Sequence, residues 1–101
     1  MRDLTGKQKR MLKGLGQGLK PSAHIGKAGL SKGLLQQIDE LLRRHELVKI
    51  RLGEGDRHER KETANQIAVP LAAAFVSATG RTALFYRASE ELPESQRIHL
   101  P

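Results

Sequence analysis

The hydrophobic pattern of residues 31–52 constrains the fold of this chain more than any other feature. Within residues 31–45, apolar residues recur every three or four positions, as on one face of a helix that Ser31 can cap; they are Leu34, Ile38, Leu41 and Leu42. Within residues 47–52 the period changes to two, since Val48, Ile50 and Leu52 alternate with other side chains. A helix that leads directly into a half-buried strand predicts a sheet with helices packed on it, which is the α/β class.

The first third of the chain predicts a helix and then a short strand. Thr5-x-x-Gln8 forms a capping box at the start of a helix over residues 6–15. Spaced glycines are expected to end this helix, because each one lowers helix stability by ~1 kcal/mol relative to alanine; they are Gly14, Gly16 and Gly18. Residues 21–25 open with a proline and predict a short strand that enters a glycine-rich loop.

The second half of the chain predicts one more helix and a hairpin. Asp56-x-x-Glu59 caps a helix that Pro70 kinks or ends, and its apolar face consists of Ala64, Ile67, Ala68 and Leu71. Residues 75–78 and 82–87 predict a terminal hairpin. The order is therefore α-β-α-β-α-β-β, which predicts an α/β fold with a four-stranded mixed sheet and three helices.

Length and composition predict one cytoplasmic domain. We assign residues 1–88 to this domain and residues 89–101 to a polar tail that Ile98 and Leu100 are expected to dock. There is no cysteine, which excludes disulfides and thiolate metal sites and fits a reducing cytoplasm. No signal peptide is visible, and the longest apolar stretch is too short to span a bilayer. We therefore expect no membrane partner.

The positive charge of the chain is concentrated in its first third. Residues 1–32 contain eight Lys or Arg and one acid, whereas residues 33–101 contain ten basic and ten acidic residues. The whole net charge of +7 therefore comes from the first third. A pI near 10.3 with this segregation favours a polyanionic partner, RNA or DNA, over an anionic membrane surface. A basic but inert surface is the alternative.

A glycine-rich loop lies between the predicted strand and the second predicted helix. Gly26-Lys27-Ala28-Gly29 has the form G-x-x-G, and two glycines let the backbone approach a ligand without a Cβ in the way. The helix that follows directs free N–H groups and the positive end of its dipole to the same space, where Lys32 adds a cation. This device holds phosphates and does not read bases. We predict that Gly26, Lys27, Ala28, Gly29 and Lys32 contact a nucleic-acid backbone.

The first predicted helix carries cations and no acid of its own, unlike the second and third. We predict that these cations, with one in the segment that follows, contact the same phosphate chain, and a merely solvated helix face is the alternative; they are Lys7, Lys9, Arg10, Lys13 and Lys20. Lys49 and Arg51 share one face of the predicted strand with Leu47. They either extend the binding surface or follow Leu47 into the core.

The chain contains few aromatic residues, which limits base stacking. Phe85 and Tyr86 are adjacent in a predicted strand and point to opposite faces, so one of them is expected in the core. A domain that stacks bases on its sheet needs several aromatic side chains on one face. Stacking is at most a minor contribution here.

No arrangement of residues predicts catalysis or a metal site. The four histidines are scattered, and none has the i, i+4 spacing of a zinc-binding helix; they are His24, His45, His58 and His99. Asp39 and Glu40 are consecutive, so they face different directions on a helix and cannot act as a pair. We therefore predict a protein that is not an enzyme, that needs no cofactor or metal and that has no small-molecule substrate.

Five motifs, in order along the chain, resemble the CRM domain family. They are Leu4-Thr5-Gly6-Lys7-Gln8-Lys9, Leu19-Lys20-Pro21, Ile25-Gly26-Lys27-Ala28-Gly29-Leu30-Ser31, His45-Glu46-Leu47-Val48-Lys49-Ile50, and Gly80-Arg81-Thr82 with Leu84-Phe85-Tyr86-Arg87. Within the family, the chain is similar to the small stand-alone bacterial YhbY-type RNA-binding proteins. The resemblance implies a fold similar to the C-terminal domain of translation initiation factor three, and RNA binding through the G-x-x-G loop. It also implies association with precursors of the large ribosomal subunit.

These observations give a leading function and three alternatives. The leading hypothesis is a non-enzymatic RNA-binding protein that assists assembly of the large ribosomal subunit and binds its ribosomal RNA. The charge distribution alone also permits a general DNA-binding or nucleoid protein. A small enzyme that acts on RNA and a protein-interaction module with an exposed sheet face are the remaining alternatives.

Overall fold

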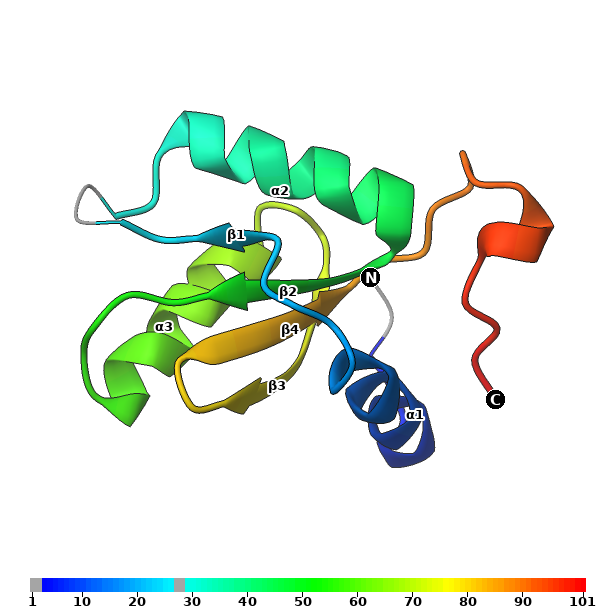
Figure 1. Ribbon diagram of the computed structural model, residues 1–101, viewed down its shortest axis with the longest axis horizontal. Helices are drawn as coiled ribbons and strands as arrows, with labels where there is room; N and C mark the ends of the chain where they lie inside the picture. Colours follow the sequence, from blue (N-terminus) through cyan, green and yellow to red (C-terminus); the bar gives the residue numbers. More distant parts are fainter. Residues whose placement is uncertain (1–2, 27–28) are drawn as a thin grey trace.

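The computed structural model describes residues 3–26 and 29–101 and confirms the α/β class. Within these residues it contains three α-helices, four strands and one short 3-10 helix (Figure 1). In chain order they are α1 (Gly6–Gly16), β1 (Ala23–His24), α2 (Lys32–His45), β2 (Leu47–Arg51), α3 (Arg57–Ala68), β3 (Ala74–Thr79), β4 (Thr82–Tyr86) and η1 (Glu94–Gln96).

The strands form one four-stranded mixed sheet, as the sequence predicts, and their order in it is β1-β2-β4-β3. β1 pairs with β2 in parallel, with α2 as the connection between them, and the other two pairs are antiparallel. The ladder between β1 and β2 extends beyond β1, because the N–H groups of Ser22 and Ile25 donate to the carbonyls of Lys49 and Arg51, each at 2.9 Å. A two-residue strand is thereby fixed at the edge of the sheet.

Helices cover both faces of the sheet (Figure 1). The larger core lies between the sheet and the helices α2 and α3, where Ile38, Ile67 and Phe85 are buried completely. The smaller core lies under α1, whose Leu12 is buried against one side chain from β2, one from β3 and two from β4; they are Leu47, Val76, Leu84 and Tyr86. The sheet is therefore the middle layer of three.

The ends of the helices confirm most of the capping predictions. Both capping boxes form, with Thr5 and Asp56 as the N-caps, and Ser31 caps α2. α3 ends at Ala68, shortly before Pro70. α1 ends at Gly16, one residue beyond the predicted end and among the spaced glycines that were expected to end it.

The aromatic residues of β4 lie on opposite faces, and both are buried. Phe85 is in the larger core, where its ring centroid lies 5.9 Å from that of Phe75, and Tyr86 is in the smaller core. The sequence predicted only one of the two in the core. The difference arises because α1 covers this part of the second face, which the sequence pattern of a single strand does not reveal. Neither Phe85 nor Tyr86 is available to stack on a base.

The segment that follows β4 is held by Glu46, a residue that the sequence marks only as a helix-to-strand transition. Glu46 has a φ of 63° and is 1% exposed. Its carboxylate accepts the N–H of Ser89 at 2.7 Å and the N–H of Ile98 at 2.6 Å. Ile98 and Leu100 pack against the smaller core, and the Gln8 side chain donates to the Pro101 carbonyl at 3.1 Å. The tail therefore runs back along α1.

Candidate nucleic-acid interface

A backbone hydrogen bond joins the two glycines of the G-x-x-G loop. The N–H of Gly29 donates to the carbonyl of Gly26 at 3.0 Å, and Gly29 has a φ of 73°, a conformation that favours glycine. A Cβ built on either glycine would meet nothing within 4 Å. The predicted contact residues Lys27 and Ala28 lie outside the described residues. The two glycines thus leave open space on the outside of the loop.

The loop leads into the N-terminus of α2 (Figure 1). The Ser31 hydroxyl accepts the N–H of Leu34 at 3.0 Å, and α2 begins at Lys32, which is exposed. No acid lies in the first turn of α2 to neutralise the positive end of its dipole. The start of α2 therefore presents free N–H groups and a cation next to the loop, which is what a phosphate requires.

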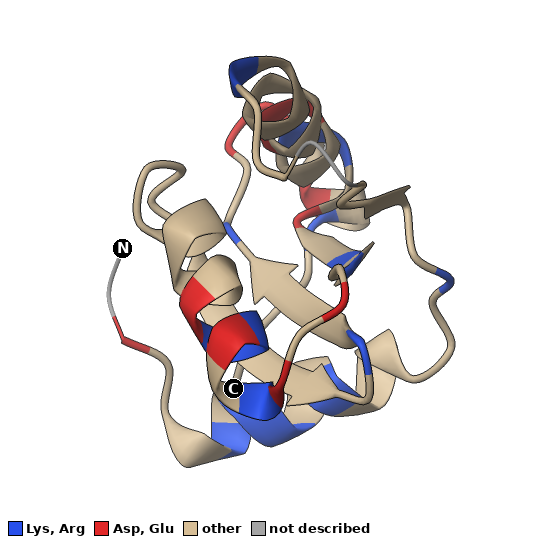
Figure 2. Cartoon of the chain, turned by 90° about the vertical axis from the view of Figure 1, so that its left-hand side faces the viewer, with Lys and Arg blue, Asp and Glu red and all other residues tan. Residues whose placement is uncertain are grey.

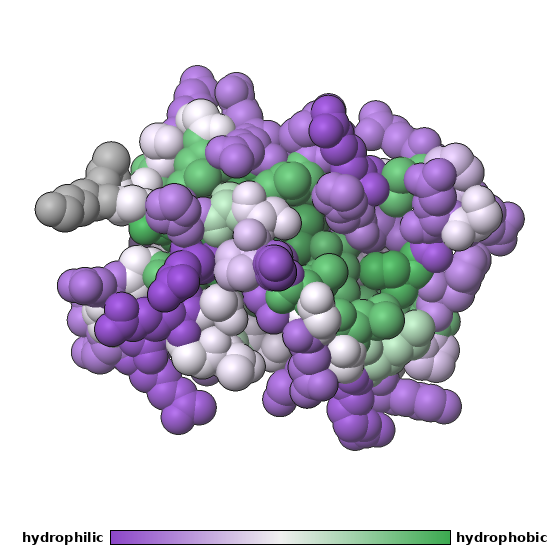
Figure 3. Space-filling view, in the orientation of Figure 1, coloured by the Kyte–Doolittle hydropathy of each residue, from purple (hydrophilic) through white to green (hydrophobic). Residues whose placement is uncertain are grey.

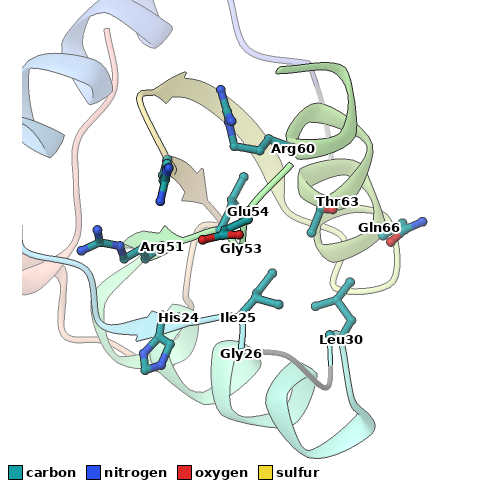
Figure 4. Close-up of a pocket in the computed structure, with 13 residues that line it drawn as sticks. His24, Ile25, Gly26, Leu30, Arg51, Gly53, Glu54, Arg60, Thr63 and Gln66 are labelled. Atoms are coloured by element: carbon teal, nitrogen blue, oxygen red, sulfur yellow. The ribbon is translucent and has the colours of Figure 1, made fainter. Parts of the chain in front are cut away.

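A groove of about 630 Å³ lies beside the loop (Figure 4). Its walls are the loop glycines, the end of β2 and one face of α3. His24 and Arg51, which are register partners in β1 and β2, point to one side of it, and Thr63 and Gln66 come from α3 on the other (Figure 4). The groove is wide and open, as a surface for an extended polymer must be.

Three arginines line this groove, and the sequence analysis did not assign two of them to any site. The side chain of Arg51 is exposed, so it does not follow Leu47 into the core. It extends the basic surface along the groove, which is the other alternative stated for it. Arg60 comes from α3 and also donates to the carbonyl of Gly55, and Arg81 comes from the β3–β4 turn. One acid, Glu54, lies among them. Only the tertiary fold brings these arginines to the loop, because they are distant from it in sequence.

The cations of α1 lie apart from the loop. Figure 1 shows the start of α2, which follows the loop, near one end of the long axis, whereas α1 lies across the sheet from α2 and away from that end. Figure 2 shows basic residues along α1 at the lower edge of the view, whereas α2 at the top carries both signs. The predicted contact residues thus form two groups, one at the loop with Lys32 and one on α1; the exposed members of the second group are Lys7, Lys9, Arg10 and Lys13, with Lys20 in the segment that follows.

Within the described residues, the cations of α1 and Lys32 form no ion pair, whereas three arginines of α2 and β4 do. On α2, Arg43 and Arg44 pair with acids of the same helix, and Arg87 of β4 pairs with Asp39 at 2.7 Å. In the part of the chain that the structure describes, no ion pair involves a cation of α1, Lys32 or Arg51. Their charge is therefore available to an anionic ligand.

Apolar side chains of α1 and of the segment that follows it are partly exposed. Met11, Leu15 and Leu19 remain 37%, 47% and 39% exposed. Figure 3 shows apolar residues that reach the surface between α2 and α1, with hydrophilic residues around them. The surface near α1 thus combines cations with apolar contact area.

Acidic and histidine side chains do not gather into a metal site in the described residues, where no group of three or more could hold an ion. His58 pairs with Glu62 at 3.2 Å on the surface of α3. Across residues 3–26 and 29–101, no helix is long and apolar enough to cross a membrane.

Comparison with known proteins places the chain in a family. The model of the CRS1 / YhbY (CRM) domain matches residues 4–87. A protein of Haemophilus influenzae named "RNA-binding protein" is 38% identical over 101 residues, which is 100% of this chain and 98% of the relative. The Bacillus subtilis protein named "Probable RNA-binding protein YqeI" is 31% identical over 98 residues, covering 97% and 99% of the two chains. The solution structure of a hypothetical protein from Staphylococcus aureus has a TM-score of 0.83 and 34% identity, and the match covers 98% of this chain and 100% of that one.

Proposed function

This chain belongs to the CRS1 / YhbY (CRM) domain family, and we propose that it binds RNA without catalysing a reaction on it. The observation that carries the proposal is the match, over the full length of the chain, to relatives that are named RNA-binding proteins. The charge distribution agrees with it, because Lys32 and Arg51 lie beside the loop and α1 carries a second group of exposed cations.

In this proposal, the loop 26–29 binds the phosphates of the RNA backbone. A phosphate placed over the loop meets the free N–H groups at the start of α2 and the cation of Lys32, with no Cβ in the way at Gly26 or Gly29. Arg51 and Arg81 lie along the adjoining groove and extend the contact to neighbouring phosphates. Contacts of this kind fix the position of an RNA and carry little base specificity.

The RNA in question is that of precursors of the large ribosomal subunit. We base this on the resemblance to the YhbY-type proteins, since a basic surface alone does not distinguish one RNA from another. The protein would bind structured ribosomal RNA while the large ribosomal subunit matures. A general DNA-binding role is the alternative that the charge alone permits.

Salt-dependent binding tests this function. If the loop and α1 cations meet about four to six phosphates, log K for large-subunit ribosomal RNA falls with log salt at a slope of roughly −3 to −5. The same measurement on DNA of matched length serves as the comparison, and we expect weaker binding there. A slope near zero, or tighter binding to DNA than to RNA, would overturn the proposal. Sedimentation of a cell extract tests the partner, since the protein is expected with large-subunit precursors and not with the nucleoid.

A further inference from the structure

One half of the sheet face under α1 is polar and uncovered. Val48 and Ile50 point into the larger core, so Lys49 and Arg51 point to the opposite face, where α1 lies. On β4, Ala83 and Phe85 likewise point into the larger core, which leaves Thr82 on the α1 face. The register therefore decides which polar residues gather here.

The strand register aligns these residues in two rows. His24 is opposite Arg51, Arg51 is opposite Thr82, and Thr82 is opposite Thr79, so one row crosses all four strands. In the next row, Lys49 and Ser77 both lie opposite Leu84. Neighbouring strands are ~4.8 Å apart, so the longer row spans roughly 14 Å. We call these residues the polar sheet face; they are His24, Arg51, Thr82, Thr79, Lys49 and Ser77.

α1 covers the apolar part of this face and ends over Leu84, the residue that lies between Lys49 and Ser77 in the second row. Gly16 lies directly over Leu84, and Leu12 is buried against the apolar part of the sheet. Beyond this contact, a groove of about 400 Å³ runs between α1 and the strands, with Lys13 and Gln17 on its helix side and Lys49 on its sheet side. His24, Arg51 and Thr79 are exposed.

The polar sheet face connects the two separate groups of predicted contact residues. At one end, His24 and Arg51 also line the groove beside the loop. At the other end, Lys49 shares a groove with Lys13 of α1. No acid lines this second groove within the described residues. A basic path therefore runs from the loop, across the sheet, to α1.

We propose that the polar sheet face is a contact surface for the sugar–phosphate backbone of RNA, which it carries from the loop 26–29 to α1. The inference rests on the proposed function, because it extends the path of the same RNA. The site develops the alternative in which Lys49 and Arg51 extend the binding surface, and it adds the residues that the strand register aligns with them.

The side chains present favour a backbone over bases or a protein. Lysine and arginine recognise phosphates, and hydroxyl groups accept hydrogen bonds from the ribose 2′-hydroxyl. The Thr82 hydroxyl donates its proton to the Thr79 carbonyl at 2.9 Å, so its oxygen remains an acceptor. The rows contain no Phe, Tyr or Trp, so the imidazole of His24 is the single ring among these six residues on which a base can stack, and apolar anchors of the kind that dominate protein interfaces are missing from them.

A pair of charge-matched variants tests the proposal. Lys49→Gln combined with Thr79→Glu removes a cation and adds a carboxylate to the polar sheet face. Lys61→Gln combined with Ser95→Glu makes the same change of net charge at exposed positions of α3 and η1. For large-subunit ribosomal RNA, we expect the first variant to lower the magnitude of the salt slope by about one to two, with weaker binding, and the second to leave it near that of the parent. Equal losses in both variants would overturn the proposal, since general charge would then explain them.

Amide shifts of the unmodified protein provide a second, independent measurement. On titration with a short hairpin RNA of mixed sequence, we expect shifts at Ser77, Thr79 and Thr82 as well as at Gly26 and Gly29. Shifts restricted to the loop and α1 would overturn the proposed path and leave the proposed function intact. If the parent protein bound neither RNA, the proposed function would fail, and the path with it. A circular dichroism melt of each variant separates a loss of contact from a loss of fold.

Discussion

Replacing Gly16 with alanine tests how closely α1 approaches the sheet. A Cβ on Gly16 would lie 2.6 Å from one Cδ of Leu84, 2.9 Å from the other and 3.3 Å from its Cγ. Leu84 is 4% exposed and packs among the residues of the smaller core, so its side chain has little room to withdraw. The substitution forces either Leu84 out of its rotamer or α1 away from the sheet.

The expected change in the free energy of unfolding follows from a comparison of Gly16→Ala with Gly14→Ala. A Cβ on Gly14 would meet nothing within 4 Å, so Gly14→Ala changes only helix propensity and stabilises the protein by up to about 1 kcal/mol. Gly16→Ala has at most the same gain and adds an overpacking cost of about 1–3 kcal/mol. We therefore expect Gly16→Ala to be less stable than Gly14→Ala by about 1–3 kcal/mol.

Urea unfolding followed by far-ultraviolet circular dichroism measures this difference. The two variants should have similar m values and different midpoints, because the surface exposed on unfolding is almost the same. If Gly16→Ala is as stable as Gly14→Ala, α1 does not rest on Leu84 as described. The position of Lys13 beside the polar sheet face would then need revision as well.

Two further predictions concern buried groups near the tail. Glu46→Ala leaves the N–H groups of Ser89 and Ile98 without their charged acceptor, and we expect it to lower the free energy of unfolding by roughly 3 kcal/mol in a denaturation experiment. Glu91→Ala is the control, because Glu91 is exposed and its loss should change stability very little. Equal effects of the two variants would contradict the role of Glu46. Burial, and to a smaller extent the charge of Glu46, raises the pKa of Tyr86 above its ordinary value of 10.0. Because the folded-state pKa is the higher one, this contribution to stability is complete below pH 10 and is lost as the pH rises through the raised pKa. Tyr86 is the single tyrosine and there is no tryptophan, so phenolate absorbance follows it directly, and ionisation of the folded protein at or below its ordinary pKa would refute the effect.

Local signals in the sequence predicted the elements and the class of the fold. The capping residues Thr5, Ser31 and Asp56 mark the three helix starts, and the change of period after His45 marks the boundary between α2 and β2. These features depend on neighbours three or four positions apart, and the sequence shows such neighbours directly. The family motifs were also visible in this way.

Long-range contacts decided what the sequence could not show. A glycine signals a weak helix, but Gly16 is needed where α1 meets Leu84, and that partner is known only once the sheet is formed. The Glu46 carboxylate accepts the backbone N–H of Ser89, which lies 43 positions later in the chain. Likewise, Arg60 and Arg81 reach the loop groove only through the packing of α3 and the hairpin. The sequence therefore marked the loop, the α1 cations and, as one of two alternatives, Lys49 and Arg51, but it did not show which residues the strand register aligns with them.

The Gly26→Asp variant tests most directly whether the loop 26–29 binds RNA. Gly26 is not among the glycines with positive φ, and a Cβ there meets nothing within 4 Å, so the variant should fold. Gly29→Asp is a poorer test, because a φ of 73° strains any side chain. Gly26→Ala is the matched control, since it adds the Cβ without the charge.

The measurement is the affinity of these variants for large-subunit ribosomal RNA across a salt series, together with a circular dichroism melt. We expect Gly26→Asp to bind much more weakly than the parent and Gly26→Ala to lose less, because a carboxylate repels the phosphate that the loop holds. Lys27→Ala should lower the magnitude of the salt slope by about one. If Gly26→Asp and Lys27→Ala remain folded and bind like the parent, the loop does not hold the RNA.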